Sequence, residues 1–274
     1  MNKLITGSKY AILAVVLLST LFPVYWMTVI ATQADSLAKV SLVPSAPTWK
    51  HVISIFTVER YMLPLANSFM VTAASLLIVL VFGLSCAYVL GRRSFRVKFR
   101  NALLVWVLLV RVLPPIAFAL PLYILMNDAG LLSTKLPVIL AHVLINLPFV
   151  IWFMLAFFSG VPEEIEESAR VDGASEFTIF AKVIVPLVVP GIAAVTILSF
   201  MDSWNEYLYS VIFIQSPDSF TVPLKLATLN SEQELTEWGK VASGGMISMI
   251  PVLLTAVFMQ RHLMNGLTAG AVKE

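Results

Sequence analysis

The chain has 274 residues, of which 59% are hydrophobic and 12% charged, and its mean hydropathy is +0.89. Soluble domains carry about a quarter charged residues, so this composition excludes an ordinary water-soluble globule and indicates a multi-span membrane protein. The net charge is only +2, and the one basic cluster, residues 92–100, lies between two apolar runs, a position that favours a membrane-flanking role over nucleic-acid binding.

Six apolar stretches are long enough for the roughly 20 residues that a helix needs to cross a bilayer. They are Tyr10–Ala31, Leu65–Leu90, Ala102–Met126, Leu136–Ser159, Pro186–Glu206 and Val241–His262. The first exceeds the core of a signal peptide, about 7–15 residues, so we interpret it as an uncleaved span; a signal cleaved near Ala31 or Ala34 is the alternative. The sequence therefore predicts an all-α polytopic membrane protein with six transmembrane helices, forming one integral membrane domain over residues 1–274.

Lys and Arg residues cluster in the short loop 92–100, between the second and third spans. Because loops rich in Lys and Arg stay in the cytoplasm, this cluster places loops 91–101 and 160–185 inside. An even number of spans then puts both termini in the cytoplasm. The long segments 32–64 and 207–240 are expected to be external.

Motifs for nucleotide hydrolysis, zinc proteolysis and serine hydrolysis are missing from the sequence. His51, His142 and His262 lack the spacing of metal ligands, and Cys86 has no second cysteine to pair with. We therefore predict no catalytic residue, metal or cofactor in this chain, and an intramembrane enzyme is disfavoured. His142 lies within a span, where a polar contact between helices is the preferred interpretation and a proton relay is the alternative.

The loop between the fourth and fifth spans, residues 160–186, predicts a helix, a turn and a second helix. Pro162 suits the first position of a helix, and the four glutamates that follow favour its positive end. Gly173 can adopt the left-handed conformation that ends a helix, and Ser175 can cap the next one, which Pro186 ends.

The first of these helices has an acidic side and two small residues, which a partner's surface could approach closely. Glu166 and Arg170 are four residues apart and are expected to pair along the helix. A solvated acidic loop is the alternative interpretation. The residues expected to contact a partner are Glu163, Glu164, Glu167, Ser168, Ala169, Asp172, Gly173 and Phe177.

The same loop resembles the signature E-x-A-x-x-x-G, then nine residues, then aliphatic–x–aliphatic–Pro, of binding-protein-dependent ABC importer permeases. Here it reads Glu167-Ser168-Ala169, Gly173 and Val183-Ile184-Val185-Pro186, with serine where the family usually has alanine. Further stretches resemble the carbohydrate branch and, at the C-terminus, maltose-type permease subunits. They are Asn67-Ser68, Ala87-Tyr88 with Arg92, Arg111–Pro115, Pro121-Leu122-Tyr123, Ser203–Glu206, Gln260-Arg261 and Asn265–Lys273.

This resemblance implies a type I importer permease with a cytoplasmic coupling helix, in a bacterial or archaeal cytoplasmic membrane. Its implied partners are membrane lipid, a second permease subunit, an ATPase dimer that holds ATP and Mg, and an extracytoplasmic solute-binding protein. Glu167 would pair with a basic group of the ATPase, Gly173 would set the turn, and 216–238 would face the binding protein. The tail 261–274 would also reach the ATPase, through Gly266, Leu267, Thr268, Ala269 and Gly270.

The expected solute is a sugar or oligosaccharide, with a polyol, a glycerol-phosphate-like solute or an acidic sugar as alternatives. From another class, an ion-coupled secondary transporter would need neither an ATPase nor the Glu167–Gly173 pattern.

Arg111 lies about ten residues into the third span, where an ionised group usually faces a cavity or a partner. Asp202 and Glu206 are its candidate partners. The candidate translocation path is completed by groups suited to sugar hydroxyls and ring faces, which are Asn146, Trp204, Asn205 and Tyr207. A buried ion pair that fixes helix packing is the alternative. The resemblance to maltose-type permeases, in which the sugar site lies mainly on the other permease subunit, argues against direct sugar contact in this chain.

Overall fold

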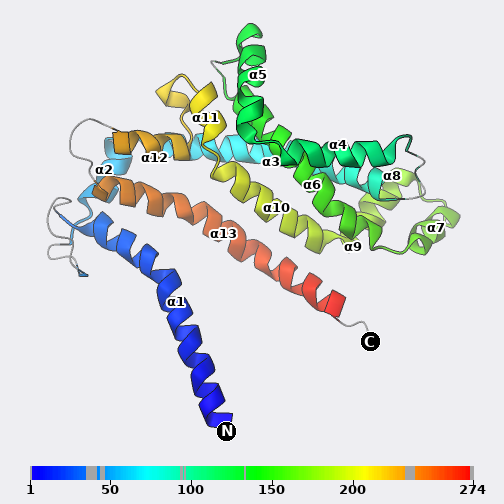
Figure 1. Ribbon diagram of the computed structural model, residues 1–274, viewed down its shortest axis with the longest axis horizontal. Coiled ribbons are helices and arrows are strands. Elements are labelled where there is room, and N and C mark those ends of the chain that lie inside the picture. Colours follow the sequence, from blue (N-terminus) through cyan, green and yellow to red (C-terminus); the bar gives the residue numbers. More distant parts are fainter. Residues whose placement is uncertain are drawn as a thin grey trace. The chain divides into compact units, whose positions relative to one another are not determined.

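The computed structural model describes residues 2–34, 42–43, 47–92, 95, 97–132, 134–231 and 238–271, with side chains in the ranges from 8 to 229 and from 238 to 258. These residues are almost entirely helical (Figure 1). The long helices are α1 (Asn2–Thr32), α3 (Met62–Gly91), α4 (Arg100–Val112), α5 (Pro115–Asp128), α6 (Leu136–Ser159), α10 (Val189–Trp204) and α13 (Trp238–Ala271). The short ones are α2 (Lys50–Thr57), α7 (Glu163–Val171), α8 (Glu176–Thr178), the π-helix η1 (Ile179–Ile184), α9 (Val185–Leu187), α11 (Leu208–Phe213), the 3-10 helix η2 (Pro217–Ser219) and α12 (Val222–Ser231).

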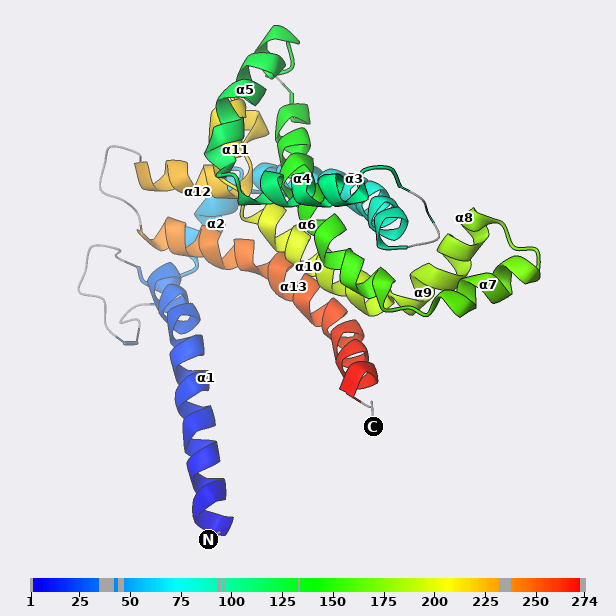
Figure 2. The ribbon, with the colours of Figure 1, turned by 45° about the vertical axis from the view of Figure 1, so that its right-hand side comes forward.

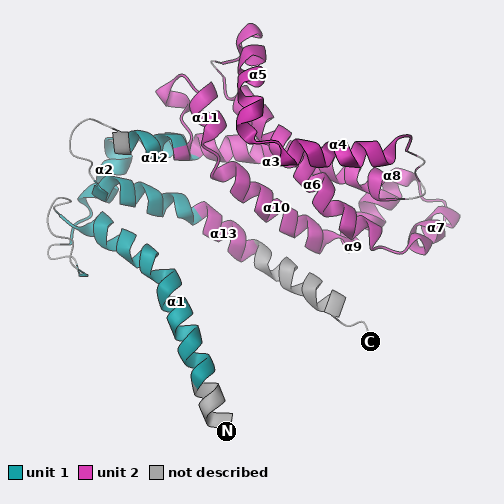
Figure 3. Cartoon of the chain, in the orientation of Figure 1, with its two compact units in different colours: residues 1–65, 224–250 teal, residues 66–223, 251–274 magenta. Residues whose placement is uncertain are grey.

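The chain forms two compact units, which Figure 3 distinguishes by colour. The first unit comprises residues 1–65 and 224–250. Within it, the Tyr61 hydroxyl is buried and lies 2.9 Å from the hydroxyl of Ser248. The carboxylate of Glu59 accepts a hydrogen bond of 2.8 Å from Lys225, and Lys240 lies 3.5 Å away on its other side. These contacts join the connection between α2 and α3 to α12 and α13.

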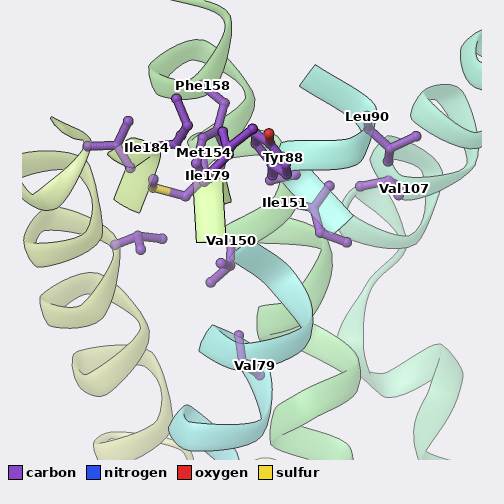
Figure 4. Close-up of a cluster of buried hydrophobic side chains, with 13 residues drawn as sticks. Val79, Tyr88, Leu90, Val107, Val150, Ile151, Met154, Phe158, Ile179 and Ile184 are labelled. Carbon is purple, nitrogen blue, oxygen red and sulfur yellow. The ribbon is translucent and has the colours of Figure 1, made fainter. Parts of the chain in front are cut away.

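The second unit comprises residues 66–223 and 251–274 and contains the larger apolar core. Its buried side chains come from α3, α4, α6 and the stretch from η1 to α10 (Figure 4). The ring of Tyr88 lies 5.6 Å from that of Phe158 and 5.0 Å from that of Phe180. Gly83 allows α3 to approach α6 closely, because a Cβ there would stand 2.7 Å from Val150. The core therefore fixes α3, α6 and η1 to one another.

Four unbroken helices are long and apolar enough to cross a membrane, and two bent pairs bring the number to six if each pair is one span. The unbroken spans are 8–32, 62–91, 136–159 and 238–258 of the described residues. Their positions match four of the six predicted stretches. An all-α polytopic fold is therefore confirmed, with the third and fifth spans differing from expectation.

The third predicted span is a bent pair of helices rather than a straight one. Helices α4 and α5 meet at an angle of 94° around Leu113 and Pro114. A proline pushes the residue before it into extended backbone, and two consecutive prolines do so twice. Leu113 has ψ 137° and Pro114 has ψ 135°, so the helix ends there and restarts at Pro115.

The fifth span is also bent, and its break lies two residues beyond the expected one. Pro186 lies inside α9, and the helix breaks at Val188, where the segment 176–187 meets α10 at 79°. The next proline, Pro190, occupies the first turn of α10, where its missing N–H leaves no intrahelical bond unmade. Pro190 rather than Pro186 therefore sets the start of the straight part of this span.

Candidate functional site

The loop between α6 and η1 folds as its sequence predicts, into a helix, a left-handed turn and a capped second helix. Pro162 immediately precedes α7, one position earlier than expected. Gly173 has φ +81°, a conformation that side chains rarely adopt. The hydroxyl of Ser175 accepts a hydrogen bond of 3.3 Å from the backbone N–H of Thr178. In Figures 1 and 2, α7 and α8 lie together at one end of the second unit.

The surface formed by α7, the turn after it and α8 is open to solvent and carries most of the residues predicted to contact a partner. Glu163, Glu164, Glu167, Ser168, Asp172, Gly173 and Phe177 are all exposed, whereas Ala169 is half-buried against the core. Phe177 is 77% exposed and Val171, which the sequence did not single out, is 88% exposed. The exposed face thus combines carboxylates with apolar side chains that nothing else in the described chain covers.

The opposite face of α7 is held by an ion pair that sequence reasoning missed. Nε of Arg92 lies 2.6 Å from Oε1 of Glu166, and both side chains are at most 2% exposed. The N–H of Nε does not point along this contact, whereas Nη1 of Arg92 donates a hydrogen bond of 2.5 Å to the carbonyl of Val161. The predicted pairing of Glu166 with Arg170 also forms, at 3.3 Å.

Arg170 in turn joins α7 to α8. Its guanidinium donates hydrogen bonds of 2.7 and 3.1 Å to the two carboxylate oxygens of Glu176. Four alternating charges therefore run from the end of α3 through α7 to α8. From the sequence, all of the basic cluster 92–100 was interpreted as flanking the membrane. The structure shows that Arg92 differs from this interpretation, because its side chain is buried and pairs with Glu166.

A cavity of about 540 Å³ lies within the second unit and gathers most of the predicted path residues. Its lining is Arg111, Pro115, His142, Ile145, Asn146, Asp202, Ser203, Glu206, Tyr207, Leu208 and Tyr209. Arg111 pairs with Asp202 rather than Glu206, at 3.5 Å, and its guanidinium lies over the ring of Phe149. Both charged side chains are more than two-fifths exposed, so the pair is accessible to a solute in the cavity.

A polar network forms the deeper wall of this cavity. The carboxylate of Glu206 lies 3.2 Å from Nε2 of His142 and accepts a hydrogen bond of 2.7 Å from the backbone N–H of Tyr209. The amide of Asn146 donates to the hydroxyl of Ser203 at 3.2 Å. His142 thus makes a polar contact between α6 and the connection between α10 and α11.

Two residues assigned to the path do not line the cavity. Trp204 is buried and stacks on Phe200, with ring centroids 5.6 Å apart, and the amide of Asn205 donates to the carbonyl of Met201. Conversely, Ser203 and Tyr209 line the cavity without having been predicted, and Tyr209 also donates a hydrogen bond of 2.7 Å to the carbonyl of Pro115. Because α10 ends at Trp204, the backbone turns there and directs neighbouring residues to different sides.

The tail residues predicted to reach the ATPase, Gly266, Leu267, Thr268, Ala269 and Gly270, fall in the last part of α13, where side chains are outside the described set. Among the described residues, no three His, Cys, Asp or Glu side chains stand close enough together to hold a metal ion. The site therefore consists of the α7 surface and the cavity.

A family model described as "Binding-protein-dependent transport system inner membrane component" matches residues 79–268. The chain is 31% identical over 262 residues to the diacetylchitobiose uptake permease DasC of Streptomyces coelicolor, covering 94% of each chain. It is also 31% identical over 255 residues to the trehalose transport permease SugB of Mycobacterium tuberculosis, covering 92% of each. These matches confirm the resemblance to permeases of the carbohydrate branch.

A solved structure of a bacterial ABC transporter that imports the acidic polysaccharide alginate contains a chain with the same fold. The TM-score is 0.79 at 18% identity, and the match covers 95% of this chain and 96% of that one. The chain belongs to the family of binding-protein-dependent transport system inner membrane components, which are ABC importer permeases. It is thus a non-catalytic membrane subunit with a type I importer permease fold.

Proposed function

We propose that this chain imports a sugar or oligosaccharide as one of two permease subunits, and that α7 receives the motion of a separate ATPase dimer. The observation that carries the proposal is the two-faced geometry of α7. Its outer face presents Glu163, Glu164 and Glu167 to solvent, while Glu166 on its inner face is buried against Arg92. With this geometry, a partner can bind the exposed face of α7, and the buried face can transmit the partner's movement to the rest of the chain.

The outer face fits a partner with basic side chains around an apolar depression. Charge-assisted hydrogen bonds would form on Glu167 and its neighbours, and the exposed ring of Phe177 would enter the depression. Gly173 would set the turn, and the tail 261–274 would add a second contact. ATP and Mg would be bound by the ATPase, since this sequence has no phosphate-binding loop.

In this proposal the whole chain is a single permease domain of a bacterial or archaeal cytoplasmic membrane, with both termini in the cytoplasm. The basic loop 92–100 supports that orientation. The stretch 216–238 would then face the extracytoplasmic binding protein. A second permease would complete the translocation path, of which the cavity around Arg111 and Asp202 is this chain's half.

The charge of that cavity favours a neutral carbohydrate over an anionic one. Arg111 alone would attract an acidic sugar or a phosphorylated solute, but Asp202 lies 3.5 Å from it and balances its charge. The pair offers donors and acceptors side by side, which suits neighbouring sugar hydroxyls, and Tyr207 adds an exposed aromatic ring. The relatives named for diacetylchitobiose and trehalose transport support the same class of solute.

Uptake measurements in proteoliposomes test the proposal, with the chain reconstituted together with a candidate second permease, ATPase and binding protein. Trehalose and diacetylchitobiose, both radiolabelled, are the first probes. Glu167→Lys and Gly173→Arg should abolish ATP-dependent uptake while the protein still reaches the membrane. Uptake that needs no ATPase would instead identify an ion-coupled secondary transporter.

Matched controls lie at the end of α5 and in the turn after it. Asp128 is an exposed carboxylate, and Gly130 is an exposed glycine with φ +68° and open space around it, as Gly173 has. Asp128→Lys and Gly130→Arg therefore repeat the same changes of charge and backbone away from α7. Equal losses in test and control variants would argue against a specific role for the α7 surface.

A further inference from the structure

Helix α3 differs from the other candidate spans in having no interruption between its first turn and its end. Prolines lie inside α1, α6 and α13, and the two remaining spans are bent pairs. Between Leu65 and Gly91 the sequence of α3 contains no proline. At 1.5 Å per residue, the helix from Asn67 to Gly91 is about 36 Å long, enough to reach across a bilayer as one rod.

One end of this rod is fixed to α7. Arg92, the residue after α3, forms the buried pair with Glu166 and donates to the carbonyl of Val161. The hydroxyl of Ser159 adds a hydrogen bond of 3.3 Å to the carbonyl of Gly91. Tyr88, one turn earlier, packs on the rings of Phe158 and Phe180. The contacts involve α6, α7 and η1, so this end of α3 cannot shift without them.

The other end of the rod is fixed to the segment around η2. The side-chain amide of Asn67 donates hydrogen bonds to two backbone carbonyls, at 2.8 Å to Asp218 and at 3.0 Å to Phe220. The hydroxyl of Ser68 accepts a hydrogen bond of 2.8 Å from the backbone N–H of Val222. Asn67 and Ser68 are both buried. These side chains therefore supply hydrogen-bond partners for two backbone carbonyls and one backbone N–H of the segment 218–222.

The Arg92–Glu166 pair is poorly explained as a source of stability. Desolvating two charges offsets much of their attraction, and apolar residues of similar volume are often as stabilising. What a buried pair adds is a fixed register, because a displaced charge would be left without a partner in an apolar core. The Arg92–Glu166 pair therefore acts as a rigid joint between the two helices, so that α3 moves when α7 moves.

We propose that α3 is a stiff connection between the ATPase-facing helix α7 and the 218–222 segment at its other end. Arg92 with Glu166 and Asn67 with Ser68 are the positioning residues of its two joints. The inference rests on the proposed function, in which 218–222 lies on the side of the binding protein. Docking of a loaded binding protein against 218–222 would then displace α7 through α3. In the reverse direction, ATP-driven movement of α7 would displace 218–222.

The test measures how strongly the loaded binding protein stimulates ATP hydrolysis by the complete reconstituted complex, with trehalose and diacetylchitobiose as the solutes. Glu166→Gln and Asn67→Leu each disconnect one end. Each should lower the stimulation by about fivefold or more, the lower end of the usual range for coupling between two sites, while basal hydrolysis stays at the wild-type rate. A purely structural defect would lower basal hydrolysis and complex yield in parallel, and that result would overturn the proposal.

Stiffness is tested separately from the joints at two exposed positions on α3. Leu77 and Val81 are 65% and 55% exposed, so truncating them removes little packing. Leu77→Gly with Val81→Gly should weaken the stimulation, whereas Leu77→Ala with Val81→Ala should not, because glycine loosens a helix that alanine leaves intact. Equal stimulation in the two double variants would overturn the role of α3 as a rod.

Failure of this inference is distinguishable from failure of the proposed function. If the wild-type complex shows no ATP-dependent uptake, the proposed function is wrong. If wild-type uptake is ATP-dependent and the variants at both joints retain full stimulation, the proposed function stands and the connection through α3 does not. Asn127→Leu, an exposed asparagine at the end of α5, is the matched control for Asn67→Leu.

Discussion

The carboxylate of Glu206 holds the start of α11 and the ring of His142 at the same time. It accepts hydrogen bonds from the backbone N–H groups of Tyr209 and Ser210, at 2.7 and 3.2 Å, and lies 3.2 Å from Nε2 of His142. One side chain therefore satisfies the donors of a helix start and a histidine on α6. The wall of the cavity depends on it.

Glu206→Ala should destabilise the protein because it leaves these backbone donors and the histidine without an acceptor. The expected loss is about 1–3 kcal/mol, the usual cost of leaving a buried polar group unpaired. Thermal unfolding of the detergent-purified chain measures it. Glu206→Gln retains one oxygen acceptor and should lose less. Asn205→Ala, at the exposed neighbouring position, should change stability by only about 0.5 kcal/mol. A Glu206→Ala variant as stable as Asn205→Ala would contradict the bracing role.

Glu59 gives the first unit a stability that depends on pH. Burial of its carboxylate acts to raise the pKa, but the hydrogen bond from Lys225 and the charges of Lys225 and Lys240 outweigh burial and hold the pKa below its ordinary value of 4.5. A lowered pKa means that the stabilisation is complete above the unfolded-state pKa and is lost as the pH falls through the folded-state pKa.

Wild-type protein should therefore lose stability as the pH falls below about 4.5, the ordinary value from which the Glu59 pKa is lowered. Glu59→Gln should show a smaller loss over the same range and should be less stable than wild type at pH 7, by about 1.5–3 kcal/mol, the usual range for hydrogen bonds to charged groups. Unfolding followed by circular dichroism at a series of pH values checks both. Parallel curves for the two proteins would show that the Glu59 cluster is not responsible.

Local chemistry made the spans and the α7 turn predictable. The length of an apolar run directly indicates whether a helix can cross the membrane. The positive φ at Gly173 was predictable because glycine tolerates this conformation. The break at Leu113 was also readable from the two prolines that follow. Hydropathy alone does not indicate the direction of a helix axis, however. The apolar stretch of α4 and α5, whose axes meet at 94°, was therefore interpreted as one span.

Pairs distant along the chain were not predictable in the same way. His142 and Glu206 are 64 residues apart, and the partner of Arg92 is also remote. Several acidic residues were equally available to each basic one, and a single sequence offers no means of choosing among them. Glu206 was considered for Arg111, whereas the turn after Trp204 directs it to His142 and leaves Asp202 for Arg111.

The Arg111–Asp202 pair should set the preference for the charge of the solute. Asp202→Asn leaves Arg111 unbalanced, so uptake of a uronate-containing disaccharide should rise relative to trehalose. The groups are partly exposed, so the effect is at most about 1 kcal/mol, or about fivefold in the ratio of the two rates. Competition uptake in proteoliposomes measures the ratio, and Asp128→Asn removes the same charge outside the cavity. An unchanged ratio in Asp202→Asn would remove this pair from the translocation path.

Gly239 provides a test of packing between α2 and α13 in the first unit. A Cβ at this position would stand 2.4 Å from Cδ2 of His51, a buried ring whose Nε2 lies 3.0 Å from the carbonyl of Gln33. That hydrogen bond restrains the ring, so Gly239→Ala should destabilise the protein by about 1–3 kcal/mol through overpacking. At Gly160, by contrast, the nearest atom to a new Cβ lies at 3.4 Å, so Gly160→Ala should cost little.

Removing the ring should relieve the clash, which separates overpacking from a loss of backbone freedom. His51→Ala alone should destabilise, because the Gln33 carbonyl loses its neighbour and a buried side chain is removed. The double variant His51→Ala with Gly239→Ala should then be more stable than the sum of the single effects, by about 0.5–3 kcal/mol in a double-mutant cycle measured by thermal unfolding. Strict additivity would mean that the two residues do not contact each other in the folded protein.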